Sequence, residues 1–186
     1  MTIAINIIAF KIGWLACVLG GANGLPWLGV IAAVVIVAFH VSSAARPGAE
    51  LRLVLAAGIL GTIWDSILAS TGWLTYTSGT LFAGTAPYWI VAMWLLFSTT
   101  LNVSLGWLKG RLALAALVGA VAGPLAFFAG HKLGAVQFEN ATLALGALAV
   151  GWAAIMPLLV VIAGRFDGFA KRGLMHGAGD LARSGT

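Results

Sequence analysis

Six long apolar stretches, joined by short polar connections, dominate this chain of 186 residues. They lie approximately at residues 3–20, 25–44, 51–71, 86–107, 112–131 and 142–164. One helix needs about 20 apolar residues to cross a hydrocarbon core about 30 Å thick. The pattern therefore predicts an all-α fold, a polytopic membrane protein whose six transmembrane helices form one bundle.

The composition indicates a lipid environment. Hydrophobic residues make up 61% of the chain and charged residues only 8%, whereas soluble domains carry about 25% charged residues. The formal net charge of +5 would suggest a nucleic-acid partner for a soluble protein. Basic cytoplasmic loops account for that excess in a membrane protein, so we expect no nucleic-acid partner.

The basic residues are distributed unequally between the two ends of the expected helices. If six helices alternate in direction, eight of the ten Lys and Arg residues share one side: Arg46, Arg52, Lys109, Arg111, Arg165, Lys171, Arg172 and Arg183. Lys132 falls on the opposite side, and Lys11 lies within the first stretch. The positive-inside rule then places both termini in the cytoplasm. We expect a transmembrane domain over residues 1–164 and a basic, partly disordered cytoplasmic tail over residues 165–186.

Lys11 and Asp65 are the charged residues that stand out inside the apolar stretches. A lone charge at such a depth costs about 2.5–3.5 kcal/mol on insertion scales. At 1.5 Å per residue, Lys11 lies about 12 Å and Asp65 about 18 Å from the cytoplasmic ends of their helices, so the two could form a pair. Three interpretations remain open: a buried ion pair that fixes helix register, a substrate or proton site, or snorkelling by Lys11 alone.

Further polar and aromatic residues surround Asp65 in the sequence. Thr62, Ser66 and Ser70 recur every four residues and should face the bundle or a wet cavity. The expected outer ends also carry aromatic residues that either ring such a cavity or anchor the bundle in lipid: Trp64, Trp73, Tyr88 and Trp89. A group formed by His131, Lys132 and Glu139 could flank an anionic headgroup or simply be solvated. The candidate substrate-binding residues are Lys11, Trp64, Asp65, Ser66, Trp89 and His131.

The fifth stretch carries a pattern typical of close helix packing. Ala122, Ala126, Gly130 and Gly134 recur every four residues, and Gly119-x-x-x-Gly123 lies beside them. Small residues at this spacing let two helix backbones approach closely. We expect an internal helix contact along the Ala122–Gly134 stripe, with a homodimer seam as the alternative.

The chain shows no motif for a metal or cofactor. His40 is expected near the cytoplasmic side of the membrane and His131 near the outer side, so they cannot ligate one haem or one metal ion. Cys17 is the single cysteine. No nucleophile elbow, phosphate loop or HExxH motif is present. We therefore expect no cofactor and no bound metal, and assign no catalytic residue.

The order of several motifs is similar to that of a known family. These motifs are Asn6, Trp14 and Cys17, then Gly61-x-x-x-Asp65, then Pro87-Tyr88-Trp89 with Trp94 and Phe97, and finally Gly123-Pro124 with Gly130 and Gly134-Ala135. Over residues 5–159 the chain resembles a family of short bacterial inner-membrane proteins of unknown function. Its members are often encoded near methyltransferases like cyclopropane-fatty-acid synthase and proteins like flavin amine oxidases. The resemblance implies a multi-pass protein of the inner membrane with a role around membrane lipid modification.

Three functions are compatible with these features. The first is a membrane protein that handles a small molecule or a lipid, either transporter-like or accessory to lipid modification. The second is an integral-membrane enzyme that acts on lipid with Asp65 as acid or base. The third is an anchor that holds a soluble enzyme through the basic face. Whether the chain is an enzyme stays open. The expected partners are membrane lipid, a small-molecule or lipid ligand, and a second copy or a soluble enzyme.

Overall fold

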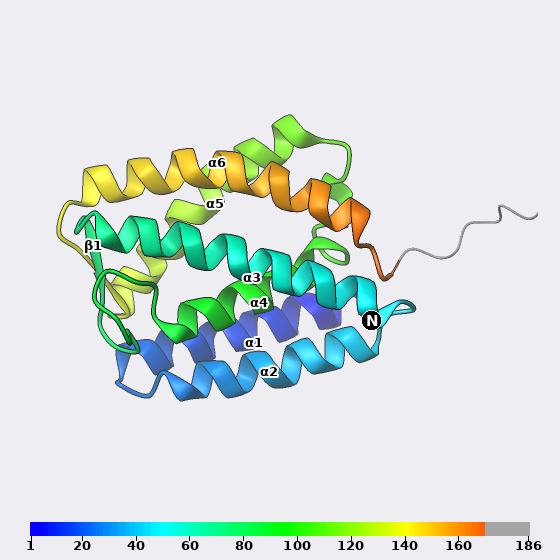
Figure 1. The fold of residues 1–186 in the computed structure, drawn as a ribbon, viewed down its shortest axis with the longest axis horizontal. Coiled ribbons are helices and arrows are strands. Elements are labelled where there is room, and N and C mark those ends of the chain that lie inside the picture. The colour runs from blue at the N-terminus through cyan, green and yellow to red at the C-terminus, as the bar shows by residue number, and fades with distance from the viewer. Residues whose placement is uncertain (170–186) are drawn as a thin grey trace, which may run out of the picture.

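The computed structural model describes residues 1–169 and contains six α-helices that run side by side (Figure 1). The helices are α1 (Ile3–Ala22), α2 (Trp27–Ser42), α3 (Pro47–Ser70), α4 (Tyr88–Leu101), α5 (Leu112–Lys132) and α6 (Ala141–Arg165). A 3-10 helix, η1 (Gly106–Leu108), follows α4. Most of the predicted tail, including Lys171, Arg172 and Arg183, lies outside the described residues.

The length and composition of the helices agree with the expected membrane character. Four helices, α1, α3, α5 and α6, are long and apolar enough to cross a membrane. The apolar helices α2 and α4 are shorter, with 16 and 14 residues. Large apolar side chains cover the outward helix faces, and Val35 of α2 and Ile59 of α3 are each 63% exposed. Such faces fit hydrocarbon rather than water. The fold is all-helical with four helices of spanning length, and a count of six spans remains a prediction.

The fourth apolar stretch forms a shorter helix than we expected. It was predicted to run over residues 86–107, but α4 ends at Leu101 and the chain turns before η1. Side chains from other helices stabilise this break. The Asn102 amide donates to Glu50 of α3 (2.7 Å), and the Asn6 carbonyl oxygen of α1 accepts from the backbone N–H of Ser104 (3.3 Å). These tertiary bonds replace helical ones, which hydropathy cannot reveal.

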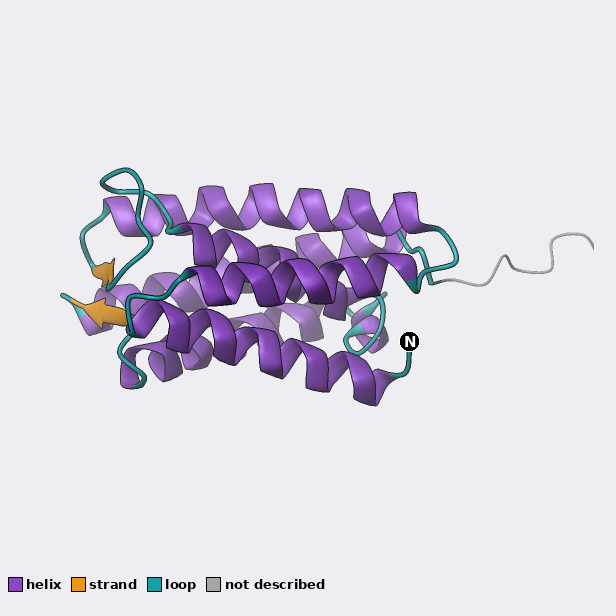
Figure 2. Ribbon diagram, turned by 90° about the horizontal axis from the view of Figure 1, so that it is seen from below, coloured by secondary structure: helices purple, strands orange, loops and turns teal. Residues whose placement is uncertain are grey.

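A small antiparallel sheet joins two connections at one end of the bundle. Strand β1 (Leu74–Tyr76) pairs with β2 (Val136–Phe138), with Leu74 opposite Phe138 (Figure 2). The connection over residues 72–85 therefore contains a strand. The sheet ties the α3–α4 connection to the α5–α6 connection. We call this end of the bundle the strand end.

The opposite end, here called the basic end, carries Arg46 and Lys109. Figure 1 shows that the N-terminus and the end of α6 both lie there. The arrangement agrees with six helices that alternate in direction. That this side is the cytoplasm stays a prediction from the positive-inside rule.

Helix α5 packs chiefly against α6, but not through the stripe we predicted. A Cβ on Gly119 would lie 2.7 Å from the Met156 Cβ, and a Cβ on Gly123 would overlap the Trp152 indole. Ala122 and Ala126, by contrast, are exposed. The predicted contact is therefore wrong at Ala122 and Ala126, whereas Gly130 is buried and a Cβ on Gly134 would lie 3.7 Å from the Ala22 Cβ of α1. The stripe that contains Gly119 and Gly123 has the same spacing as the one that contains Ala122 and Ala126. The sequence does not show which of the two packs against Trp152 of α6.

Candidate functional site

A cavity of about 500 Å³ lies between α1, α4, α5 and α6, and Asp65 of α3 contributes to its wall. Aromatic and aliphatic side chains form most of its wall. Among the described residues, Lys11 and Asp65 are the charged side chains that line it. Ligand cavities for small molecules typically measure about 300–1,000 Å³ and combine apolar walls with a few polar groups. The cavity has the size and chemistry of such a site.

Asp65 is buried beside the cavity. One of its two carboxylate oxygens has no hydrogen-bond partner among the described residues. The side chain is 1% exposed, and the Trp94 indole N–H donates to Oδ2 over 2.6 Å. Oδ1 is buried and has no hydrogen-bond partner among the described residues. A buried polar atom without a partner costs about 1–3 kcal/mol, and more when it is charged. Asp65 therefore offers an acceptor for a group that enters the cavity.

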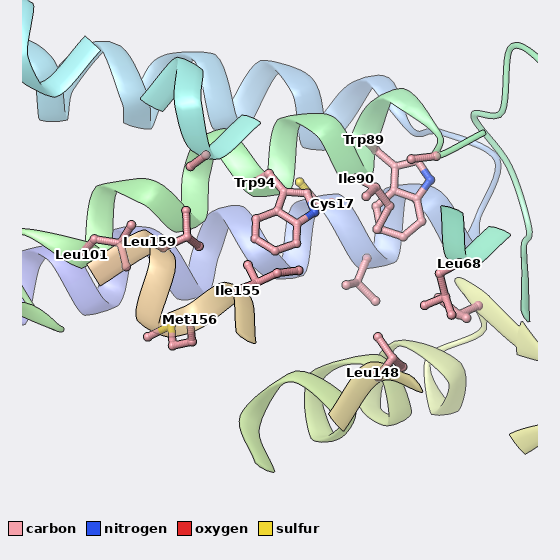
Figure 3. Close-up of a cluster of buried hydrophobic side chains, with 14 of the residues drawn as sticks. Cys17, Leu68, Trp89, Ile90, Trp94, Leu101, Leu148, Ile155, Met156 and Leu159 are labelled. Atoms are coloured by element: carbon pink, nitrogen blue, oxygen red, sulfur yellow. The ribbon is translucent and has the colours of Figure 1, made fainter. Parts of the chain in front are cut away.

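Two glycines and the Trp152 indole hold Trp94 in position. Gly61 of α3 leaves the space that the Trp94 indole fills, because a Cβ there would overlap the ring. On its other side, Trp94 stacks on Trp152 with centroids 4.8 Å apart and planes inclined by 13°. Trp152 in turn lies against Gly123 of α5. Figure 3 shows Trp94 reaching from α4 towards Ile155 of α6.

This stacking explains the spacing Gly61-x-x-x-Asp65 in physical terms. Residues four apart lie on the same face of a helix, so the Trp94 indole packs on Gly61 and reaches Asp65 with its N–H. A stacked aromatic pair adds about 0.5–1.5 kcal/mol beyond the burial of its area. The wall beside Asp65 is therefore rigid, which suits a binding site.

Other buried polar atoms near Asp65 also lack partners within the described part of the chain. The Trp152 indole N–H is one, and Trp152 lines the cavity. The Tyr76 hydroxyl in β1 is another. Burial, and secondly the charge of Asp65, raises the pKa of Tyr76 well above its ordinary value, so its phenol stays protonated. The region thus combines unpartnered donors with the unpartnered Asp65 oxygen.

Lys11 lines the same cavity but does not form the predicted ion pair with Asp65. The ion pairs between described residues join His40 to Glu50 and Lys109 to Asp167. Lys11 is exposed on α1. The Asp65 carboxylate instead accepts a hydrogen bond from Trp94 of α4. The prediction failed because a tryptophan N–H, hidden within an apolar stretch, supplies the donor that we expected from a lysine.

The remaining candidate residues are divided between the cavity and its surroundings. Trp89 lines the cavity, although its N–H donates to the Ser78 carbonyl over 2.9 Å. Trp64 lies outside the wall, where it packs against Gly151 of α6. His131 is also outside the wall, and its Nδ1 lies 3.0 Å from the Val136 carbonyl oxygen. Lys11, Asp65 and Trp89 therefore meet at one cavity, whereas Trp64 and His131 do not reach it.

Ser66 and its polar neighbours on α3 have local partners rather than a wet cavity. The Ser66 hydroxyl accepts from the backbone N–H of Ala86 over 3.0 Å and so fixes the connection before α4. Thr62 and Ser70 donate to carbonyl oxygens of their own helix, at 2.7 Å in each case. Such local bonds satisfy hydroxyls inside an apolar environment.

A second polar cluster, which sequence reasoning missed, lies at the basic end. Glu50 is fully buried, and its Oε2 lies 2.8 Å from the His40 Nε2. Its Oε1 accepts from the Asn102 amide and from the backbone N–H of Gly168, each at 2.7 Å. The segment after α6 is further held by the Lys109–Asp167 ion pair of 2.5 Å. We call these residues the Glu50 cluster, and they join α2, α3, α4 and the segment after α6.

The sequence contained a signal for this cluster. His40, Glu50 and Asn102 are polar residues near the same expected end of three consecutive helices. Polar side chains at such positions usually have partners. We considered His40 only as a metal or haem ligand, and so its carboxylate partner was overlooked.

Comparison with known proteins identifies the family without adding an activity. No curated protein and no solved structure matches the chain. A family model described as "Protein of unknown function (DUF2878)" matches residues 3–158, which include Asp65, Trp94 and the whole cavity wall. The chain therefore belongs to the DUF2878 family, as the resemblance in its motifs predicted.

Proposed function

We propose that this protein binds a small amphipathic molecule or lipid in the cavity beside Asp65. The observation that carries the proposal is the unpartnered Asp65 Oδ1, buried next to a cavity of about 500 Å³ with apolar walls. A hydroxyl or ammonium group of a ligand would donate to this oxygen. A carbonyl or ether oxygen would accept from the Trp152 N–H. The aromatic wall would hold the apolar part.

Binding is better supported than catalysis. Within the described residues, the wall holds Asp65 and Lys11 as its charged groups and no serine, cysteine or histidine. The acid–base enzyme considered above would need a second group that acts together with Asp65, and Lys11, the other charged group of the wall, is exposed on α1 and forms no ion pair with it. We further propose that the protein resides in a bacterial inner membrane, with the basic end in the cytoplasm, and acts as a transporter or as an accessory to lipid modification.

The proposal can be tested by filling the cavity from α5. Ala126 lines the cavity and is exposed towards it, so Ala126→Phe occupies space without displacing packed neighbours. Ala113 is exposed on the same helix but lies outside the wall, so Ala113→Phe is the matched control. Native mass spectrometry of protein extracted in mild detergent would measure the retained small molecules.

The expected result is a defined adduct on the wild-type protein and on Ala113→Phe that is lost from Ala126→Phe. Asp65→Asn keeps the shape of the side chain and should weaken retention of the same adduct. Wild-type protein without any adduct, or an adduct that persists unchanged in Ala126→Phe, would contradict the proposal.

A further inference from the structure

The cavity is open on one side, between α1 and α5. Both helices line it, yet they are not packed against one another along their length. They approach at the strand end, where a Cβ on Gly134 would lie 3.7 Å from the Ala22 Cβ. Ala122 and Ala126 line the cavity and are nevertheless exposed. Because this side of the bundle would face hydrocarbon, the opening leads into the bilayer rather than into water.

Lys11 lies on the α1 side of this opening. It is exposed, lines the cavity, and has no ion-pair partner among the described residues. It occupies the ninth position of a 20-residue helix, α1 (Ile3–Ala22), far from either end. A lysine at that depth is costly unless an anion or water accompanies it. The opening therefore presents a cation, while the buried carboxylate of Asp65 presents an acceptor.

We infer that the ligand is a single-chain lipid with an anionic group and a neighbouring hydroxyl, and that it reaches the cavity sideways from the bilayer between α1 and α5. The anionic group, a carboxylate or a phosphate, pairs with Lys11 in the opening. The hydroxyl donates to the Asp65 Oδ1, and the chain lies against the aromatic wall. A cavity of about 500 Å³ suits one such molecule better than a lipid with two chains.

This inference rests on the proposed function, and it adds the class of ligand and the route of access. The inference and the proposed function can be tested separately, because Lys11 and Asp65 would bind different groups of the ligand. A long-chain alcohol has the hydroxyl without the charge, a fatty acid has the charge without a separate hydroxyl, and a hydroxy fatty acid has both. Lysophosphatidate carries the hydroxyl with a phosphate in place of the carboxylate.

The experiment measures how well these four molecules displace a photoreactive single-chain probe from protein reconstituted in phosphatidylcholine vesicles. The probe is a diazirine-bearing long-chain hydroxy acid, and labelled peptides of α1 and α5 are quantified by mass spectrometry. The apolar groove beside α2 includes Val34 and Val37 and, among the residues that the structure describes, no charged side chain. It provides an internal reference for labelling from bulk lipid.

Lys11→Met should weaken displacement by the three anionic competitors about 5- to 10-fold, and Lys11→Arg should restore it. Displacement by the alcohol should be unchanged in Lys11→Met and weakened in Asp65→Asn. Lys132→Met is the matched control, since this exposed lysine lies outside the wall. A stronger effect on the carboxylates than on lysophosphatidate, or the reverse, identifies the anion within the inferred class.

Two results would overturn the inference. If Lys11→Met behaves like Lys132→Met while Asp65→Asn still weakens the alcohol, the cavity binds a neutral ligand and the proposed function stands alone. If labelling of α1 and α5 matches that of the α2 groove in every variant, the cavity takes up no single-chain lipid, and the inference and the proposed function fail together.

Discussion

Replacing Glu50 by alanine should strongly destabilise the protein. The substitution removes the acceptor of three donors, on the buried His40 and Gly168 and on the part-buried Asn102. Each buried donor left without a partner costs about 1–3 kcal/mol. The loss should therefore be at least about 3 kcal/mol, and the segment after α6 should be held less firmly, with the Lys109–Asp167 ion pair left in place.

A chain of this length loses about 2–4 °C of melting temperature per kcal/mol, so Glu50→Ala should melt on the order of 10 °C lower. The melting temperature can be followed in detergent by tryptophan fluorescence. Glu50→Gln should be milder, because its carbonyl oxygen can still accept from Asn102 and Gly168. Arg52→Ala changes an exposed residue of the same helix and should be nearly silent. If Glu50→Ala melts like Arg52→Ala, the cluster does not hold the helices together.

Three further predictions concern packing, the carboxylate and topology. Gly61→Ala should push its Cβ into the Trp94 indole and cost about 1–3 kcal/mol, whereas Gly164→Ala meets nothing within 4 Å and should leave the melting temperature unchanged. Trp94→Phe and Asp65→Leu should be non-additive by about 1–3 kcal/mol in a double-mutant cycle, and additive effects would show that the 2.6 Å bond contributes nothing. Alkaline phosphatase should be active when fused within residues 72–85 and inactive at the C-terminus, and the opposite pattern would reverse the topology.

The helices of spanning length were predictable because a membrane helix must be apolar over its whole length. The expected stretch 112–131, for example, differs from α5 (Leu112–Lys132) by one residue. Helix α4 was not predictable to the same degree. Its end depends on bonds from Asn6 and Glu50, which lie on other helices. The three-residue strands are too short to show a period of their own.

The candidate site was predictable only in part. Asp65 could be singled out because a carboxylate is conspicuous in an apolar helix, and the structure places it beside the cavity. Its partner Trp94 could not be singled out in the same way. The chain has eight tryptophans, and the sequence does not indicate which indole donates to Asp65. The cavity itself arises where α1 and α5 fail to pack. That gap depends on which small residues of α5 meet Trp152, and spacing alone does not decide it.

The central claim, that the space beside Asp65 holds a ligand, is tested most directly by an experimental density map of the protein in lipid nanodiscs. The account predicts elongated non-protein density between α1 and α5 that reaches within hydrogen-bonding distance of the Asp65 Oδ1. A map in which α1 and α5 close against one another and leave no such density beside Asp65 would contradict it.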